Sequence, residues 1–238
     1  MTPGPSPLAH AWAFDELRTA GPEHLDAGQV AAYDARAQFD PAPDIDVLKA
    51  LGLSRQDTVL DMGAGTGTFA VAAAPLCRQV LLVEPSRAML DAAAEKLRAA
   101  ALDNVRLIKG SFLSLQVASP VEFIFCRNAL HHLPDFWKVQ ALRRLRAALK
   151  PGGVLRLKDI AFSFAPAQTE ASLSQWLEAA AHYPPGSYTA DMLATHIREE
   201  FSTFTWLLEP MLERSGFCIE QAEYSSSGVF AAYICRAA

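Results

Sequence analysis

The sequence lacks the features that mark exported, membrane-spanning or nucleic-acid-binding proteins. Its four cysteines form no C-x-x-C pair, which excludes the common zinc-finger and thioredoxin patterns. The longest apolar run, residues 69–77, includes a proline and is far shorter than the ~20 residues of a membrane span. Basic residues number 21 and acidic residues 26, for a net charge of −5, and no Lys/Arg cluster is longer than Arg143-Arg144. We therefore expect neither a membrane span nor a nucleic-acid partner.

The first residues also carry no export signal. MTPGPSPLAHAW has no basic region followed by an apolar stretch, so we expect no signal peptide and a cytoplasmic location with reduced thiols. Residues 2–7 hold three prolines and a glycine, which predicts a flexible tail. Residues 10–39 have a helical pattern broken at Gly21-Pro22, and we expect them to form a helical N-terminal cap.

From residue 58 onward, short apolar runs alternate with helical stretches. The pattern predicts strands at 58–62, 80–84, 105–109, 121–126 and from 154, with helices at 67–76, 88–101 and 136–149 and a turn at 151–153. Strands spaced by such helices are typical of parallel βαβ units. Residues 217–224 and 229–236 are joined by a short turn and must pair antiparallel. The fold class we expect is α/β, with a doubly wound, mostly parallel seven-stranded sheet, an antiparallel C-terminal hairpin and a helical N-terminal cap.

A glycine-rich turn follows the first predicted strand and opens the first helix. It reads D-x-G-x-G-x-G from Asp61 to Gly67. A dinucleotide fingerprint would need glycine where Thr68 stands, and a phosphate-binding P-loop would need a lysine. Glu84 ends the next strand, where a carboxylate can meet a ribose diol across the turn. A tight turn without a ligand is the alternative, but the turn and Glu84 together favour a nucleoside site. Asp61 lies in an apolar run and needs a cationic or hydrogen-bonding partner.

Further motifs lie beside this turn. They are Val83-Glu84-Pro85-Ser86, Gly110-Ser111-Phe112, the run from 125 to 135 that reads FCRNALHHLPD, and LKPGGV at 149–154. In this order and spacing they resemble the class I S-adenosylmethionine-dependent methyltransferases over residues from about 55 to 160. The branch that the chain resembles is the type 11/25 group, which includes quinone-biosynthesis enzymes and many small-molecule methyltransferases.

The resemblance implies a binding site for S-adenosylmethionine. The residues that it assigns to this site are Tyr33, Asp61, Gly63, Ala64, Gly65, Gly67, Glu84, Pro85, Ser86, Ser111, Phe112, Arg127 and Asn128. The turn and the end of the fourth strand would lie along the methionine part, with Asp61 near its amino group and Glu84 on the ribose hydroxyls. The adenine would lie against residues 85–86 and 111–112. Ser111 stands where the family usually has an aspartate that contacts the adenine amino group.

Three residues have open interpretations. His131 and His132 are candidates for a general base, because histidine titrates near neutrality. The alternative is that they shape the wall of the site. Adjacent side chains point apart, so we expect no metal site from this pair. Tyr33 could cover the sulfonium or pack in the core of the cap.

The chain is thus predicted to be an enzyme with two parts. Residues 1–50 would form the tail and the cap. Residues 51–238 would form a methyltransferase domain with a helical insertion at about 163–203. The expected reaction is methyl transfer from S-adenosyl-L-methionine to a small-molecule acceptor, with S-adenosyl-L-homocysteine as product. The segments expected to cover the methyl group contribute aromatic residues and no basic cluster, so an apolar or aromatic acceptor is expected. Methylation of protein or RNA, or a cofactor-binding regulatory module without turnover, are the alternatives.

Overall fold

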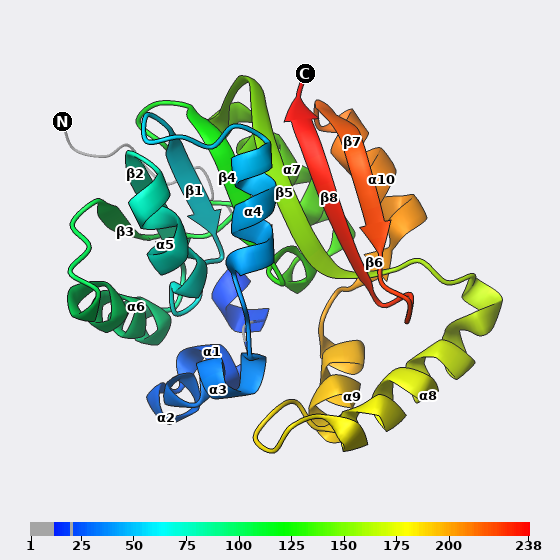
Figure 1. The fold of residues 1–238 in the computed structure, drawn as a ribbon. Helices are drawn as coiled ribbons and strands as arrows, with labels where there is room; N and C mark the ends of the chain where they lie inside the picture. The colour runs from blue at the N-terminus through cyan, green and yellow to red at the C-terminus, as the bar shows by residue number, and fades with distance from the viewer. Residues whose placement is uncertain (1–11, 20) are drawn as a thin grey trace.

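The computed structural model describes residues 12–19 and 21–238, in which one open sheet lies between two layers of helices (Figure 1). The tail predicted at residues 2–7 lies outside the described residues. The strands are β1 (Thr58–Met62), β2 (Gln79–Glu84), β3 (Val105–Lys109), β4 (Val121–Arg127), β5 (Leu149–Phe162), β6 (Thr203–Phe204), β7 (Phe217–Tyr224) and β8 (Phe230–Ala237).

The sheet order is β3-β2-β1-β4-β5-β8-β7. Strands β1 to β5 are parallel, whereas β8 is antiparallel to both β5 and β7. The expected mostly parallel sheet with an antiparallel C-terminal hairpin is therefore confirmed. The two-residue strand β6 pairs with β5 off the main path and brings the sheet to eight strands rather than seven.

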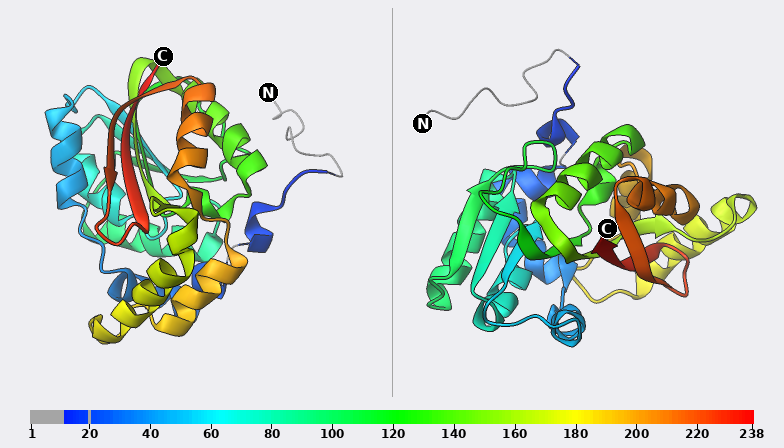
Figure 2. Two further views of the ribbon diagram at one scale, coloured as in Figure 1. Left: turned by 90° about the vertical axis from the view of Figure 1, so that its right-hand side faces the viewer. Right: turned by 90° about the horizontal axis from the view of Figure 1, so that it is seen from above.

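Helices cover both faces of the sheet, as parallel strands require. On one face lie α4 (Ala42–Ala50), α5 (Thr68–Ala73) and α6 (Arg87–Ala99), and on the other lie α7 (Asp135–Ala148) and α10 (Thr205–Arg214) (Figure 2). The 3-10 turn η2 (Ala74–Leu76) extends α5. Every residue of β1 is buried, which explains why this strand reads as an unbroken apolar run around one aspartate.

The start of β5 differs from the prediction. Residues 151–153 were expected to form a turn before the strand, but β5 already begins at Leu149 and includes them. Its pairing with β4 shifts register between Val121 and Phe123, and Gly152 adopts a left-handed φ of 73°. The Pro-Gly-Gly segment thus forms an irregular part of β5, similar to a β-bulge, and the pairing of β5 with β4 continues beyond it.

Two sets of helices lie beyond the carboxyl ends of the parallel strands, toward which the β1 arrow points in Figure 1. One set is η1 (Glu16–Thr19), α1 (Pro22–Leu25), α2 (Ala27–Ala31) and α3 (Tyr33–Ala37). The other is η4 (Pro166–Gln168), α8 (Thr169–Ala179), η5 (Ala180–His182) and α9 (Ala190–Glu199). Helices as short as α1 to α3 are not stable alone and depend on tertiary packing. No helix in the described part of the chain has both the length and the apolar character needed to cross a membrane.

Candidate functional site

The glycine turn after β1 requires glycine for both conformation and space. Gly63, Gly65 and Gly67 all have left-handed φ values, of 67°, 55° and 77°. A Cβ on Gly63 would lie 2.5 Å from the Ala129 side chain, and one on Gly67 would lie 3.0 Å from Leu82. Only glycine adopts such backbone at little cost. The turn therefore exposes backbone amides at the carboxyl end of the sheet.

Glu84 ends β2 and is buried under this turn. Its Oε2 accepts a hydrogen bond from the Gly65 N–H at 3.0 Å, and its Oε1 accepts one from the Ser86 N–H at 2.9 Å. A carboxylate offers about four lone-pair positions, so about two remain for a ligand such as a ribose diol. Burial raises the pKa of Glu84 to about 7, and the two backbone N–H groups work against this rise.

Asp61 lies near the end of β1, and one of its carboxylate oxygens lacks a hydrogen-bond partner. It is 2% exposed, and its Oδ2 has no hydrogen-bond partner. Burial, with a further contribution from the negative charge of Glu84, raises the pKa of Asp61 to about 8. A buried oxygen without a donor is costly. A ligand that brings an ammonium group would supply that donor, and S-adenosylmethionine fits this requirement.

Three cavities meet at the carboxyl edge of the sheet. One of about 80 Å³ is lined by ten of the predicted cofactor residues: Tyr33, Gly63, Gly65, Glu84, Pro85, Ser86, Ser111, Phe112, Arg127 and Asn128. A second, of about 640 Å³, is lined by Asp61 and Ala64 and shares Tyr33 and Arg127 with the first. Gly67 lines none of these cavities and acts in the turn alone.

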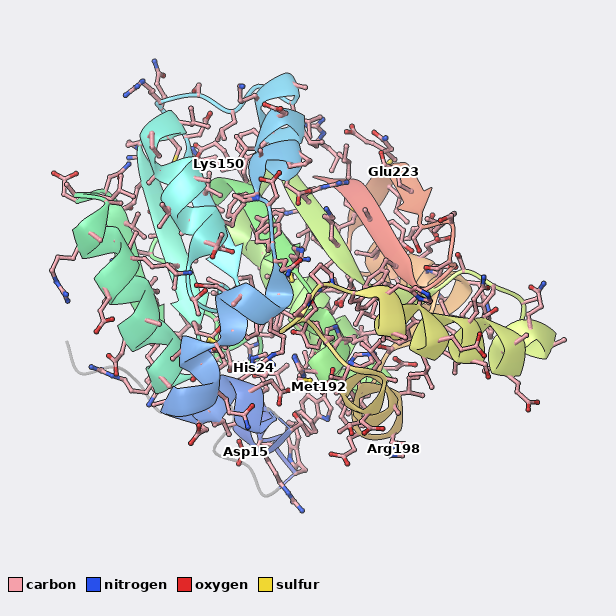
Figure 3. All side chains as sticks on the ribbon, turned by 60° about the horizontal axis from the view of Figure 1, so that its bottom comes forward. Asp15, His24, Lys150, Met192, Arg198 and Glu223 are labelled. Carbon is pink, nitrogen blue, oxygen red and sulfur yellow. The ribbon has the colours of Figure 1, made fainter. Side chains whose placement is uncertain are left out.

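The third cavity, of about 510 Å³, lies between α1–α3 and the α8–α9 segment. Its lining includes His24 of α1 and Met192 of α9, which lie on neighbouring segments in Figure 3. Tyr33 and Arg127 line this cavity as well as the other two, and Asn128 is shared with the 80 Å³ cavity. The structure therefore places Tyr33 at the junction of all three spaces.

The part of the site that was predicted to bind adenine contains a carboxylate that the sequence did not indicate. Ser111 Oγ is 2.9 Å from Ser114 Oγ. Beside it, the carboxylate of Glu16 accepts hydrogen bonds from the N–H groups of Phe112 at 3.0 Å and Leu113 at 2.9 Å. Burial raises the pKa of Glu16 above its usual value. The acidic group near position 111 thus comes from η1, almost a hundred residues away in sequence, and no local pattern identifies it.

Polar contacts fasten the short helices to the turn and to α6. Lys96 of α6 donates to Thr66 Oγ1 at 2.8 Å and to Thr68 Oγ1 at 2.9 Å, and it forms an ion pair with Asp34 of α3. Thr66 Oγ1 also donates to Asp34 Oδ1 at 2.5 Å. We call Asp34, Thr66, Thr68 and Lys96 the cap clamp. It holds the helix that begins at Tyr33 against the glycine turn.

The two adjacent histidines have different surroundings. His131 is buried, and its Nδ1 faces Asp159 Oδ1 of β5, whose Oδ2 accepts from the His131 backbone N–H at 3.1 Å. Burial opposes a charge on this ring, but the carboxylates of Asp159 and Glu200 raise the pKa of His131 to about 9. Burial and the nearby His131 lower the pKa of His132 well below its usual value.

The carboxylate of Glu200 lies close to three histidine rings. Its Oε2 lies 3.0 Å from His131 Nε2, 2.5 Å from His196 Nδ1 and 3.8 Å from His132 Nδ1. Sequence analysis did not identify Glu200, His196 or Asp159. The i,i+4 spacing of His196 and Glu200 was the only local signal, and it carries meaning only once the fold brings His131 beside it.

Comparisons with known proteins agree with this arrangement. Residues 59–153 match the family described as a methyltransferase domain. An uncharacterized methyltransferase of Oceanobacillus iheyensis is 30% identical over 117 residues, which are 49% of this chain and 53% of that protein. One of Bacillus mycoides is 28% identical over 86% of this chain and 87% of its own length. In the first of these alignments, the chain spans about half the length of the relative that it matches.

A solved structure shows the same fold. The S-adenosylmethionine-dependent methyltransferase from Clostridium acetobutylicum superposes with a TM-score of 0.66 and 17% identity, over 86% of this chain and 95% of its own. At this identity the likeness establishes the fold. The sheet, the glycine turn and the matched segment thus agree on one type of domain.

Proposed function

We propose that this chain is a class I S-adenosylmethionine-dependent methyltransferase and that it methylates a small, largely apolar acceptor held in the 510 Å³ cavity; the matched domain and the fold support the first part. The observation that carries this proposal is the junction of cavities at Tyr33 and Arg127. A ligand that follows the glycine turn reaches the acceptor space at these two residues, so donor and acceptor can meet there.

S-adenosylmethionine supplies a methyl group on a sulfonium centre, which is already activated for transfer. In the proposed arrangement, Glu84 accepts from the ribose hydroxyls and Asp61 accepts from the ammonium group through its unpartnered Oδ2. Tyr33, which is partly buried, lies beside Gly65 of the turn and would help to exclude water. The chain then acts mainly by alignment of the two reactants, an effect that can supply about 7–11 kcal/mol of the barrier reduction.

The lining of the 510 Å³ cavity supports a small acceptor. Its volume falls in the range of small-molecule sites, about 300–1,000 Å³. Apolar and aromatic side chains make up much of its wall: Ile160, Trp176, Tyr183, Tyr188, Met192, Leu193 and Phe230. Arg127 is the sole Lys or Arg among its lining residues, so the cavity offers no basic track for nucleic acid.

His132 is the polar group best placed to contact the acceptor. It lines both the cofactor cavity and the acceptor cavity, and its buried Nδ1 has no hydrogen-bond partner. We expect this nitrogen to bind a polar group on the acceptor and to orient it toward the methyl donor.

The test combines cofactor binding with transfer of a labelled methyl group. Purified protein should bind S-adenosylmethionine and transfer label to low-molecular-weight aromatic compounds from a chemically diverse panel. Met192→Trp should narrow the acceptor cavity and lower transfer while leaving cofactor affinity unchanged, whereas His182→Ala, an exposed control in η5, should alter neither. Cofactor binding without transfer to any small molecule, together with label on protein or RNA, would refute the small-molecule assignment.

A further inference from the structure

We propose that His131, His196 and Glu200 form a binding site for a divalent transition-metal ion of the zinc type in the wall of the acceptor cavity. One ligand atom from each residue can be chosen so that all three lie within 4.8 Å of one another. All three residues line the 510 Å³ cavity, so a bound ion would face the space assigned to the acceptor. Two imidazoles and a carboxylate are a ligand set that zinc uses in catalytic sites.

Each imidazole is oriented from behind by a second polar group. The Nδ1 of His131 is held by Asp159, and the Nε2 of His196 lies 2.9 Å from Ser202 Oγ. The opposite nitrogen of each ring faces Glu200. Metal-binding histidines usually have such an outer partner, which fixes the tautomer and leaves the inner nitrogen free to coordinate.

The centre of the cluster is held by ion pairs whose hydrogen-bond geometry is poor. Glu200 Oε2 is buried close to two ring nitrogens, yet it has no hydrogen-bond partner of acceptable geometry. His132 Nδ1, 3.8 Å from the same oxygen, is likewise buried and without a partner. A cation bound here would replace the ion pairs of Glu200 with His131 and His196 by coordination of the Glu200 oxygen and one nitrogen of each of these two rings.

The backbone holds the two halves of the cluster together. The Phe201 N–H donates to the His131 carbonyl at 2.9 Å, which joins the end of the α9 segment to η3 (Leu130–His132). His196 and Glu200 are four residues apart on one helical face, so both side chains approach His131 from the same side. The ligands are thus placed by two segments that are anchored to each other, as a preformed site requires.

Three protein ligands leave at least one coordination position open toward the cavity. If the proposed methyl transfer holds, that position would suit an acceptor with an oxygen or sulfur donor, such as a hydroxyl, carboxylate or thiol group. The ion would then anchor the acceptor. Because two of the three ligands are imidazoles, the ligand set favours Zn²⁺ over Mg²⁺ or Ca²⁺, which prefer oxygen ligands.

The experiment measures metal binding directly and does not depend on turnover. Tag-free protein is stripped with a chelator and titrated with Zn²⁺ and Co²⁺ by calorimetry and absorption spectroscopy, and the untreated protein is analysed for metal content. We expect one equivalent to bind. Since outer partners of metal ligands contribute about 10–100-fold to affinity, Asp159→Asn should weaken binding by about that factor, and His196→Ala or Glu200→Gln should weaken it by more than about 100-fold. His182→Ala, which removes an exposed histidine of the same segment, should bind as the parent does.

Circular dichroism and S-adenosylmethionine affinity show whether each variant is folded, because the cofactor residues lie outside the cluster. A parent protein that binds no metal in stoichiometric amount would overturn the proposal, as would equal binding by the parent, Glu200→Gln and His182→Ala. Stoichiometric metal binding without any methyl transfer would instead refute the proposed function and leave the metal site standing.

Discussion

In the proposed complex, affinity for S-adenosylmethionine should increase as the pH rises from about 6 to about 7. The unpartnered Oδ2 of Asp61 must be part of an ionised carboxylate to pair with the ammonium group of the ligand. Burial and the charge of Glu84 raise the pKa of Asp61 to about 8, so the free protein holds this group mostly protonated at neutral pH. Binding therefore requires the release of a proton.

The magnitude follows from the ionised fraction. With a pKa of about 8, about 1% of Asp61 is ionised at pH 6 and about 10% at pH 7, which corresponds to about a tenfold gain in affinity, or about 1.4 kcal/mol. An α-amino group with a pKa of about 8 stays largely charged over this interval, so the ligand contributes little to the slope. A raised pKa means that the folded free protein favours the protonated carboxyl group. This contribution to the stability of the fold is complete at pH values below the usual carboxyl pKa. That stabilisation is lost as the pH rises through about 7 for Glu84 and about 8 for Asp61.

Isothermal titration calorimetry at the two pH values measures the affinity, and repetition in buffers of different ionisation enthalpy measures the proton released. Asp61→Asn keeps the size of the side chain and removes its titration, so it should bind more weakly at pH 7 and keep only the smaller pH dependence contributed by Glu84, whose pKa of about 7 lies in the same interval. An affinity in the parent protein that is equal at both pH values, or a slope in Asp61→Asn as steep as in the parent protein, would refute the assignment of this carboxylate to the ammonium group.

Three further substitutions test the site and the frame around it. Glu84→Ala should weaken cofactor binding by about 10–150-fold, since charge-assisted hydrogen bonds contribute about 1.5–3 kcal/mol, whereas Glu95→Ala on the exposed side of α6 should bind normally by calorimetry. Gly63→Ala should lower the free energy of unfolding by more than about 1 kcal/mol in urea, because φ is positive and the added Cβ meets another side chain at 2.5 Å; an unchanged midpoint would contradict this. Asp44→Ala should cost about 3–5 kcal/mol by removing a buried carboxylate that pairs with two cations of β5, while exposed Asp46→Ala should cost little.

The sheet and its glycine turn were predictable because local sequence encodes them. The buried strands read as apolar runs, and the spacing of Asp61, the glycines and Glu84 reflects contacts within one βαβ unit, where pairing of β1 with β2 leaves little freedom. The two-residue strand β6 was not predictable, because two residues carry no periodicity and only the neighbouring β5 defines the strand.

The cluster around Glu200 shows where local inference ends. Nothing in the residues near His131 indicates that its ring nitrogens face carboxylates from β5 and from the end of α9, since those partners are 28 and 69 positions away in the chain. The expectation that adjacent histidines point apart is wrong: the ring centroids of His131 and His132 lie 4.4 Å apart, both rings approach Glu200 Oε2, and both residues line the 510 Å³ cavity. Glu16 illustrates the same limit at the predicted adenine end, where a short 3-10 turn supplies the carboxylate.

The cap clamp has a kinetic consequence. Tyr33 borders all three cavities, and the helix that begins with it is fastened to α6 through Asp34 and Lys96. In the proposed cycle, we expect a spent cofactor beside Tyr33 to leave faster when these contacts break, so that a surface ion pair would influence the rate of product exchange. Such an ion pair weakens as salt screens it. The turnover of this protein should therefore become faster with ionic strength in the range where release, not chemistry, limits the cycle.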